Sequence, residues 1–333
     1  MILSQTKPAR FFRTALAAAF FALASVVFSA YVRLSEAGIG CPEGPACTAQ
    51  PLTPSAVQQA TSRHHERSQR AWQDMVTRYI AGALGLLLIR LTVLGWQLRR
   101  RPGQQVVVPV LTLFAVFGLT GVNVFTIDLQ SKPLVMMIQF LGSLTVLVFL
   151  WWIVLREQRL FRSVPVTPIV RSLRSRAIAA LCFGMLAMLL GAWSMVNYAG
   201  PACPDFPTCQ GDYWPDADFV EGLLRWHGEG LRYDRTELDL SSAAAIHLAH
   251  RAAAFMALLY LGWLSLHLVR VGLRDSVFRY GLLLLVMLSF ATALGIIESL
   301  GGFSLLAAVG HNAATVILLL TLVTLYHVLR APR

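Results

Sequence analysis

The chain has 333 residues, of which 56% are hydrophobic and only 14% carry a charge. Soluble domains carry about 25% charged residues, so this composition excludes a water-soluble globule. The net charge of +11 comes from short arginine clusters between apolar runs, a pattern that favours membrane topology signals over a nucleic-acid-binding surface.

Eight apolar stretches follow one another along the chain, and each is long enough to cross about 30 Å of hydrocarbon. The sequence therefore predicts an all-α integral membrane protein with eight transmembrane helices. We place them at residues 11–33, 76–98, 105–127, 133–155, 177–199, 243–269, 280–298 and 303–329. The first follows basic residues, as a secretory signal does, but its apolar run exceeds the about 7–15 residues of such a signal.

Basic residues gather on one side of this predicted topology. With the N-terminus inside, that side holds the arginine clusters and only two acids, Glu157 and Asp275, while the long connections 34–75 and 200–242 fall outside. The excess of basic residues predicts an N-in, C-in orientation. We expect a bacterial-type cytoplasmic (inner) membrane, with membrane lipid around the helices.

Four of the five cysteines lie in the two outer connections, as two pairs with identical spacing, Cys41 with Cys47 and Cys203 with Cys209. An oxidising compartment and matched spacing favour two local disulfides. A four-cysteine zinc site is the alternative, although paired structural zinc ligands usually have about two to four residues between them. Cys182, inside the fifth span, is interpreted as a small buried apolar residue.

The matched cysteines reveal an internal repeat with offsets of 162 to 173 residues. The corresponding positions are Cys41 and Cys203, Thr77 and His250, and Gln139 and His311. We therefore predict two four-helix halves, 1–155 and 177–333, joined by a basic cytoplasmic linker at 156–176. Both halves have the same orientation, so they form a parallel repeat.

Two histidines lie inside apolar spans at a similar predicted depth. His250 and His311 are each about seven or eight residues from the outer end of their spans, which corresponds to roughly 10–12 Å. An ionisable residue inside a span is costly and usually faces the protein interior. Two such imidazoles in a four-helix bundle are suitable axial ligands for a haem iron. The alternative is that each histidine only hydrogen-bonds a neighbouring helix.

Two neighbours extend this candidate site. His247 lies one turn before His250 on the same helix face, and the guanidinium of Arg251 suits a haem propionate. The alternative for Arg251 is that it snorkels to lipid headgroups. A transporter is a further alternative for the whole chain, but it predicts broken spans at the midplane, and prolines inside the spans are few.

With these residues identified, the sequence resembles the haem A synthase family, membrane enzymes that oxidise a methyl group of haem O to the formyl group of haem A. The resemblance rests on the eight spans, the two halves, and the motifs AGIGCP at 37–42, AGPACPDFP at 199–207 and the pair His250-Arg251. It implies that His250 and His311 ligate a haem b cofactor in the second half, with Arg251 and His247 beside it, and that the first half holds the haem O substrate near a carboxylate.

The first half departs from the family pattern, which has an acid three residues before a His-Arg pair and a histidine in span four. Here those positions read Asp74, Thr77-Arg78 and Gln139. The resemblance implies that Asp74 takes the place of the catalytic carboxylate and that Arg78, Thr77 and Gln139 line the substrate site. Neither Thr77 nor Gln139 is a strong iron ligand. Two functions stay open: oxidation of haem O, or a non-catalytic one-haem membrane cytochrome that delivers haem or assists oxidase assembly.

The resemblance also implies partners, namely a haem O synthase, an electron donor and assembly factors of the terminal oxidase, and no nucleic acid. His64 and His65, in the first outer connection, are interpreted as solvated loop residues or as substitute ligands. Asp74 has a second interpretation as the start of span two, where a helix dipole favours a carboxylate. Glu298, near the outer end of span seven, either marks the membrane interface or relays protons.

Overall fold

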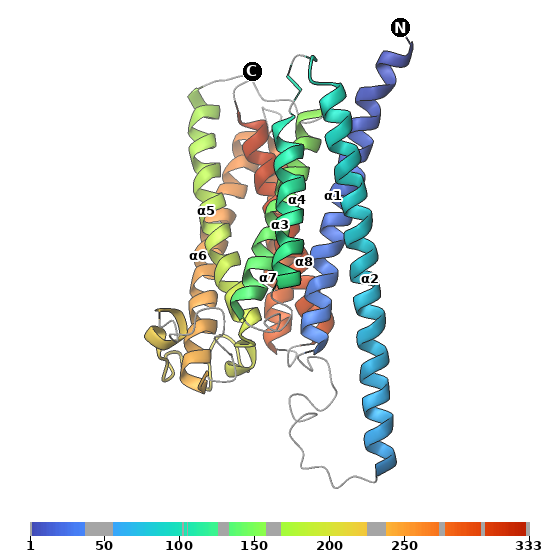
Figure 1. The fold of residues 1–333 in the computed structure, drawn as a ribbon. Helices are drawn as coiled ribbons and strands as arrows, with labels where there is room; N and C mark the ends of the chain where they lie inside the picture. Colours follow the sequence, from blue (N-terminus) through green and yellow to red (C-terminus); the bar gives the residue numbers. More distant parts are fainter. Residues whose placement is uncertain are drawn as a thin grey trace.

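The computed structural model describes residues 2–36, 56–101, 103–104, 106–125, 133–157, 168–224, 238–272, 277–300 and 304–330. In these ranges the chain is helical and contains no extended strand. The long helices are α1 (Ile2–Glu36), α2 (Ala56–Gln97), α3 (Val107–Phe125), α4 (Pro133–Glu157), α5 (Pro168–Val196), α6 (Leu240–Gly272), α7 (Phe278–Leu300) and α8 (Leu305–Val328). Two short helices, η4 (Gly200–Ala202) and η5 (Val220–Leu224), lie between α5 and α6 (Figure 1).

Seven of the described helices are long and apolar enough to cross a membrane, namely α1, α2 and α4 to α8. The apolar part of α3, Val107–Val122, is shorter, and at 1.5 Å per residue it falls below the roughly 30 Å of a hydrocarbon core. The chain is therefore an integral membrane protein. The eighth span and the orientation of the chain stay predictions.

The helices pack in two groups that share a boundary. In the first, α1 contacts α2 and α4, and α3 contacts α2 and α4; in the second, α5, α6, α7 and α8 follow one another, with α5 also against α8. The groups meet where α1 and α4 touch α8 and where α4 touches α5. One apolar core crosses this boundary, because Leu147 and Leu150 of α4 cluster with Leu319 and Val323 of α8.

The outward faces of the helices carry large apolar side chains, as expected for contact with lipid. Leu86 on α2 and Phe114 on α3 are 72% and 69% exposed. Cys182 of α5 is also exposed, so its interpretation as a buried residue is wrong. Apolarity alone does not separate the core face of a membrane helix from its lipid face, because both environments favour the same side chains.

Helix α2 begins about twenty residues before its apolar span. It starts at Ala56, so residues 56–75, expected as part of a loop, are helical. This stretch has no Gly or Pro and is rich in Ala, Gln and Arg, which favour helices in water as well as in lipid. His64 and His65 are therefore not loop residues, and Asp74 lies within α2 rather than at its N-terminus, so the dipole interpretation of Asp74 is wrong.

Helix α5 also begins early. It starts at Pro168, a residue whose fixed φ and missing N–H suit the first helical position. Arg171, Arg174 and Arg176, which the sequence placed in the linker between the halves, therefore lie on the first turns of α5. The basic cluster belongs to a helix end that extends beyond the apolar span.

Candidate functional site

A cavity of about 320 Å³ lies among α5, α6, α7 and α8. Most of its wall is apolar, and its polar lining side chains include His247, His250, Arg251, Glu298, His311 and Asn312. Leu34 of α1 and Phe140 of α4 contribute to the wall, so the cavity reaches the boundary with the first helix group. Its size and its few convergent polar groups are typical of a cofactor or ligand site.

The two predicted iron ligands come together in this cavity. His250 lies on α6 and His311 on α8, with their ring centroids 6.5 Å apart and their planes at 71°. Two imidazoles on opposite sides of one metal ion, each with a nitrogen about 2 Å from the metal, have centroids about 6–6.5 Å apart. The spacing therefore fits a pair of axial ligands to one iron.

Each histidine also makes one hydrogen bond to the backbone of an adjacent helix. Nδ1 of His250 lies 3.1 Å from the carbonyl oxygen of Ala187 on α5, and Nδ1 of His311 lies 2.8 Å from that of Ala291 on α7. A carbonyl only accepts, so Nδ1 is the donor and the Nε2 of each neutral ring keeps its lone pair. The bond to a neighbouring helix, expected as an alternative to metal ligation, thus leaves the ligating nitrogen available.

His247 lies beside His250 in the cavity wall. It is 7% exposed, its ring centroid is 6.4 Å from that of His250, and its Nδ1 lies 3.3 Å from Oγ of Ser194 on α5. The sequence placed His247 correctly on the face of His250. Its hydroxyl partner was not predicted, because nothing in the sequence pairs α6 with that turn of α5.

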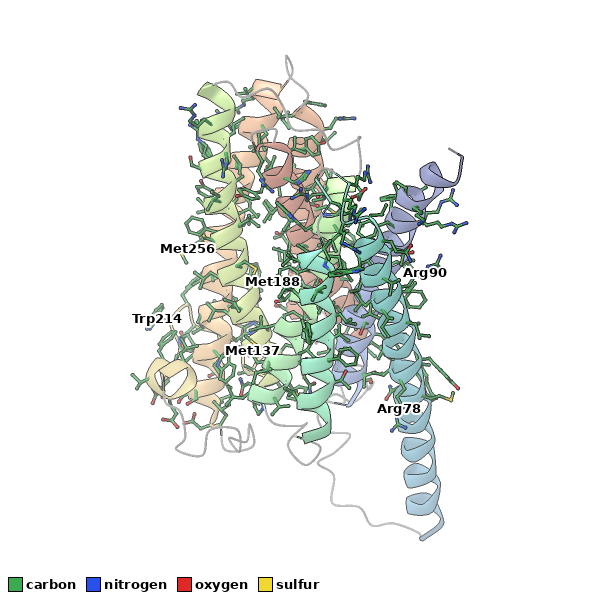
Figure 2. All side chains as sticks on the ribbon, turned by 45° about the horizontal axis from the view of Figure 1, so that its top comes forward. Arg78, Arg90, Met137, Met188, Trp214 and Met256 are labelled. Carbon is green, nitrogen blue, oxygen red and sulfur yellow. A yellow bond between two sulfur atoms is a disulfide. The ribbon has the colours of Figure 1, made fainter. Side chains whose placement is uncertain are left out.

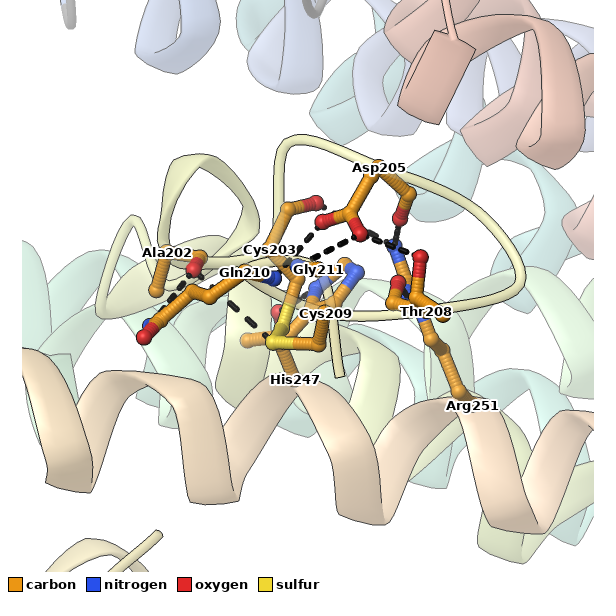
Figure 3. The surroundings of a disulfide bond; sticks show 10 residues. Ala202, Cys203, Asp205, Thr208, Cys209, Gln210, Gly211, His247 and Arg251 are labelled. Atoms are coloured by element: carbon orange, nitrogen blue, oxygen red, sulfur yellow. Dashed lines mark hydrogen bonds between the residues drawn. A yellow bond between two sulfur atoms is a disulfide. The ribbon is translucent and has the colours of Figure 1, made fainter. Parts of the chain in front are cut away.

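Arg251 binds the loop that follows α5 (Figure 3). Its guanidinium donates to the carbonyl oxygens of Asp205 at 2.6 Å, Thr208 at 2.7 Å and Cys203 at 3.2 Å. The snorkelling alternative is therefore wrong, because the charge is directed at protein carbonyls. Arg251 also lines the cavity, and its Nε is buried with no hydrogen-bond partner in the described part of the chain.

The loop itself is closed by the predicted disulfide between Cys203 and Cys209. Both cysteines are fully buried, and since their sulfurs are bonded to each other they are not available as zinc ligands. The other predicted pair, Cys41 with Cys47, lies outside the described residues. Phe206, which packs 5.6 Å from the Arg251 guanidinium, lines the cavity, so the disulfide loop forms part of its cover.

Asp205 stabilises the same loop from within. Its carboxylate accepts hydrogen bonds from the Thr208 hydroxyl and from the backbone N–H groups of Gln210 and Gly211. The bond from Thr208, helped by the two backbone donors, lowers the pKa of Asp205 below its ordinary value. The carboxylate is exposed to solvent and outside the helices, so its role is to hold the turn rather than to act in the cavity.

The residues predicted to line the substrate site do not line this cavity. Thr77 and Arg78 are exposed on α2, and Figure 2 shows Arg78 at the edge of the bundle. The Thr77 hydroxyl donates to the carbonyl of Gln73 on its own helix at 2.9 Å. Gln139 is half-buried on α4, and the side chain of Asp74 lies outside the described part of the structure.

Two further polar residues, Asn312 and Glu298, lie in the cavity wall and were not predicted there from the sequence. Asn312, next to His311, lines the cavity, and its Oδ1 is buried with no hydrogen-bond partner among the described residues. Its position inside a span was a sequence signal that went unused. Glu298 also lines the cavity near the end of α7, and its two interpretations, interface residue and proton relay, both stay open.

Comparison with known proteins assigns the family. The model of the COX15-CtaA family, described as cytochrome oxidase assembly protein, matches residues 12–323, which include both candidate histidines and the disulfide loop. The chain belongs to this family. A relative named heme A synthase, from Shewanella oneidensis, is 29% identical over 316 residues, which cover 93% of each protein. The predicted family resemblance is thus confirmed, and this COX15-CtaA protein carries its cavity in the last four helices.

Proposed function

We propose that this chain binds haem b between His250 and His311 and oxidises the methyl group of haem O to the formyl group of haem A, in a bacterial-type cytoplasmic membrane. The observation that supports the haem site best is the pair of imidazoles 6.5 Å apart, each with its Nδ1 bonded to a backbone carbonyl. The name of the Shewanella relative supports the reaction.

Bound haem b supplies a one-electron redox centre whose potential depends on its axial ligands and their hydrogen bonds. The chain's own residues orient and enclose that group. His250 and His311 present Nε2 from opposite helices, and the disulfide loop held by Arg251 covers the cavity at one end. The apolar wall keeps water away from the ligands.

The proposed substrate site lies in the first helix group. We assign the carboxylate role to Asp74, and contacts with the haem O substrate to Arg78, Thr77 and Gln139. Thr77 and Gln139 are weak iron ligands, so the substrate would be held by its shape, by its propionates at Arg78 and by its apolar tail. Each hydroxylation of the methyl group takes one oxygen atom from O2 and two electrons from the electron donor, with the second oxygen atom leaving as water. Two hydroxylations followed by loss of water give the formyl group, and a haem O synthase and oxidase assembly factors are the other proposed partners.

A one-haem protein without this activity is the second candidate, and a specific observation favours it. Thr77 and Arg78 are exposed, while the interior of the first helix group is filled by Phe11, Leu88 and Leu147. Such a protein would serve haem delivery or oxidase assembly through its second-group haem alone.

Co-expression with a haem O-producing enzyme, followed by extraction and chromatography of the haems, distinguishes the two candidates. We expect haem A or its hydroxylated precursor from the wild type and neither from Asp74→Asn, with the haem b spectrum unchanged. Asp212→Asn, a change in the loop outside the helices, is the matched control and should retain activity. Haem b without any oxidised product in the wild type would replace the proposed activity with the one-haem function.

A further inference from the structure

Each candidate ligand packs against a glycine of the neighbouring helix. A Cβ added at Gly191 of α5 would lie 2.7 Å from Cε1 of His250, and one at Gly295 of α7 would lie 2.9 Å from Cε1 of His311. Carbon atoms do not approach this closely without repulsion. Any side chain at either position would therefore displace the imidazole from where it lies.

Both glycines stand in the same relation to the carbonyl that binds the histidine. Ala187 precedes Gly191 by four residues, and Ala291 precedes Gly295 by four. In an α-helix the side chain of a residue leans toward the N-terminus and covers the turn before it, where the carbonyl four positions earlier lies. A glycine leaves that carbonyl uncovered, so its second lone pair can accept a bond from outside the helix.

We propose that Gly191 and Gly295 are positioning residues for the two haem ligands, each opening one helix carbonyl to an imidazole. The carbonyl holds the ring with its proton on Nδ1 and with Nε2 toward the cavity. The inference rests on the proposed haem site. A donor bond from Nδ1 makes the imidazole a more basic ligand, which stabilises oxidised iron and lowers the reduction potential.

Among the described glycines of the last four helices, only Gly191 and Gly295 would bring an added Cβ against a histidine. A Cβ at Gly262 of α6 or Gly310 of α8 would meet only leucine methyl groups, at 3.9 Å and 3.4 Å, which are ordinary contact distances. Gly310 is even the sequence neighbour of His311. Gly281 of α7 is also tightly packed, but a Cβ there would meet Leu268 and the α6 backbone rather than a histidine.

The test compares Gly191→Ala and Gly295→Ala with the matched controls Gly262→Ala and Gly310→Ala. All four proteins and the wild type are purified with protohaem and measured by low-temperature absorption, electron paramagnetic resonance and potentiometry. We expect Gly191→Ala and Gly295→Ala to lose low-spin signal to a high-spin species. Any low-spin haem left in these variants should have a raised midpoint potential. The controls should match the wild type.

A second measurement needs no haem. Nitrogen-15 NMR of histidine-labelled, haem-free protein reports which ring nitrogen carries the proton. In the wild type, His250 and His311 should both be protonated on Nδ1. Gly191→Ala should change the signal of His250 alone and Gly295→Ala that of His311 alone, while Gly262→Ala and Gly310→Ala change neither.

The positioning role of the glycines, the haem site and the carbonyl contact are each refuted by a different result. Wild-type spectra and potentials in both glycine variants would refute the positioning role while leaving the haem site intact. A wild type that binds no haem when purified with protohaem, yet has both histidines protonated on Nδ1, would refute the haem site and keep the carbonyl contact. If a glycine variant fails to fold, the wild-type NMR still decides, because protonation on Nε2 in either histidine contradicts the proposal.

Discussion

The last four helices and the first four differ at the positions that the predicted internal repeat pairs with each other. In α5 to α8 two histidines face a cavity, each bonded to a helix carbonyl. In α2 the position of His250 is taken by Thr77, which is exposed and bonds a carbonyl of its own helix. For the proposed haem site, the comparison indicates that two histidines need a helix carbonyl to hold each ring and open space beside it, which the last four helices provide.

The glycines sharpen this difference. Helix α1 contains no glycine, and at the 162-residue offset of the cysteine pairs its Ser29 takes the place of Gly191. The Ser29 hydroxyl accepts a bond from Arg33 at 2.9 Å. Gly82 and Gly85 of α2 and Gly118 and Gly121 of α3 face open space, since a Cβ there meets nothing within 4 Å. The first group therefore lacks the glycine contact as well as the ligands.

The largest expected effect comes from removing the ligands of the second group. His250→Ala and His311→Ala should each abolish the low-spin haem spectrum, because six-coordinate iron needs both axial imidazoles. Thr77→Ala and Gln139→Ala, at the equivalent positions of the first group, should leave that spectrum unchanged. Reduced-minus-oxidised spectra of the purified proteins measure both. An unaltered spectrum in both histidine variants would contradict the assignment of His250 and His311 as iron ligands. The two helix groups would then not differ in haem ligation.

A smaller effect is expected at the cover of the cavity. Arg251→Lys keeps the charge but loses the planar fork that reaches Cys203, Asp205 and Thr208. A hydrogen bond from a charged group contributes about 1.5–3 kcal/mol, and partial exposure reduces that value. We expect a loss of about 2 kcal/mol, seen as a lower Tm in detergent, with faster haem dissociation.

The control for this variant is Arg90→Lys, since Arg90 lies on α2 away from the cavity (Figure 2). It should leave both the Tm and the haem dissociation rate unchanged. Equal behaviour of the two variants would mean that the disulfide and the hydrogen bonds of Asp205 hold the loop without Arg251. Arg251 would then contribute nothing to the Tm or to haem retention in the second group.

Seven long apolar helices and the approach of His250 to His311 were predictable from sequence for physical reasons. Long apolar runs are imposed by the bilayer, and His250 and His311 stand out because ionisable residues are rare there. Helix ends such as Ala56 and Pro168 were missed, since a helix can continue into water after its apolar part ends. Polarity marks the membrane boundary, whereas helix termini depend on breakers and caps.

The contacts that the site residues make with other helices and loops could not be predicted from the sequence. That Arg251 meets the disulfide loop and that Gly191 meets His250 depends on which helix turns adjoin. The outward position of Cys182 depends on helix rotation in the same way. The glycine and the carbonyl could be inferred only once α5 was known to pack against α6 and α7 against α8.

The smallest expected effect comes from restoring the family ligands to the first group. Thr77→His with Gln139→His supplies two imidazoles, but Thr77 points to the exposed side of α2, no glycine of α1 opens a carbonyl, and Phe11, Leu88 and Leu147 fill the interior. We therefore expect one haem per protein, as in the wild type, measured by pyridine haemochrome against protein concentration. A second low-spin haem would show that ligands alone are sufficient, and that the first group lost its site by two substitutions rather than by repacking.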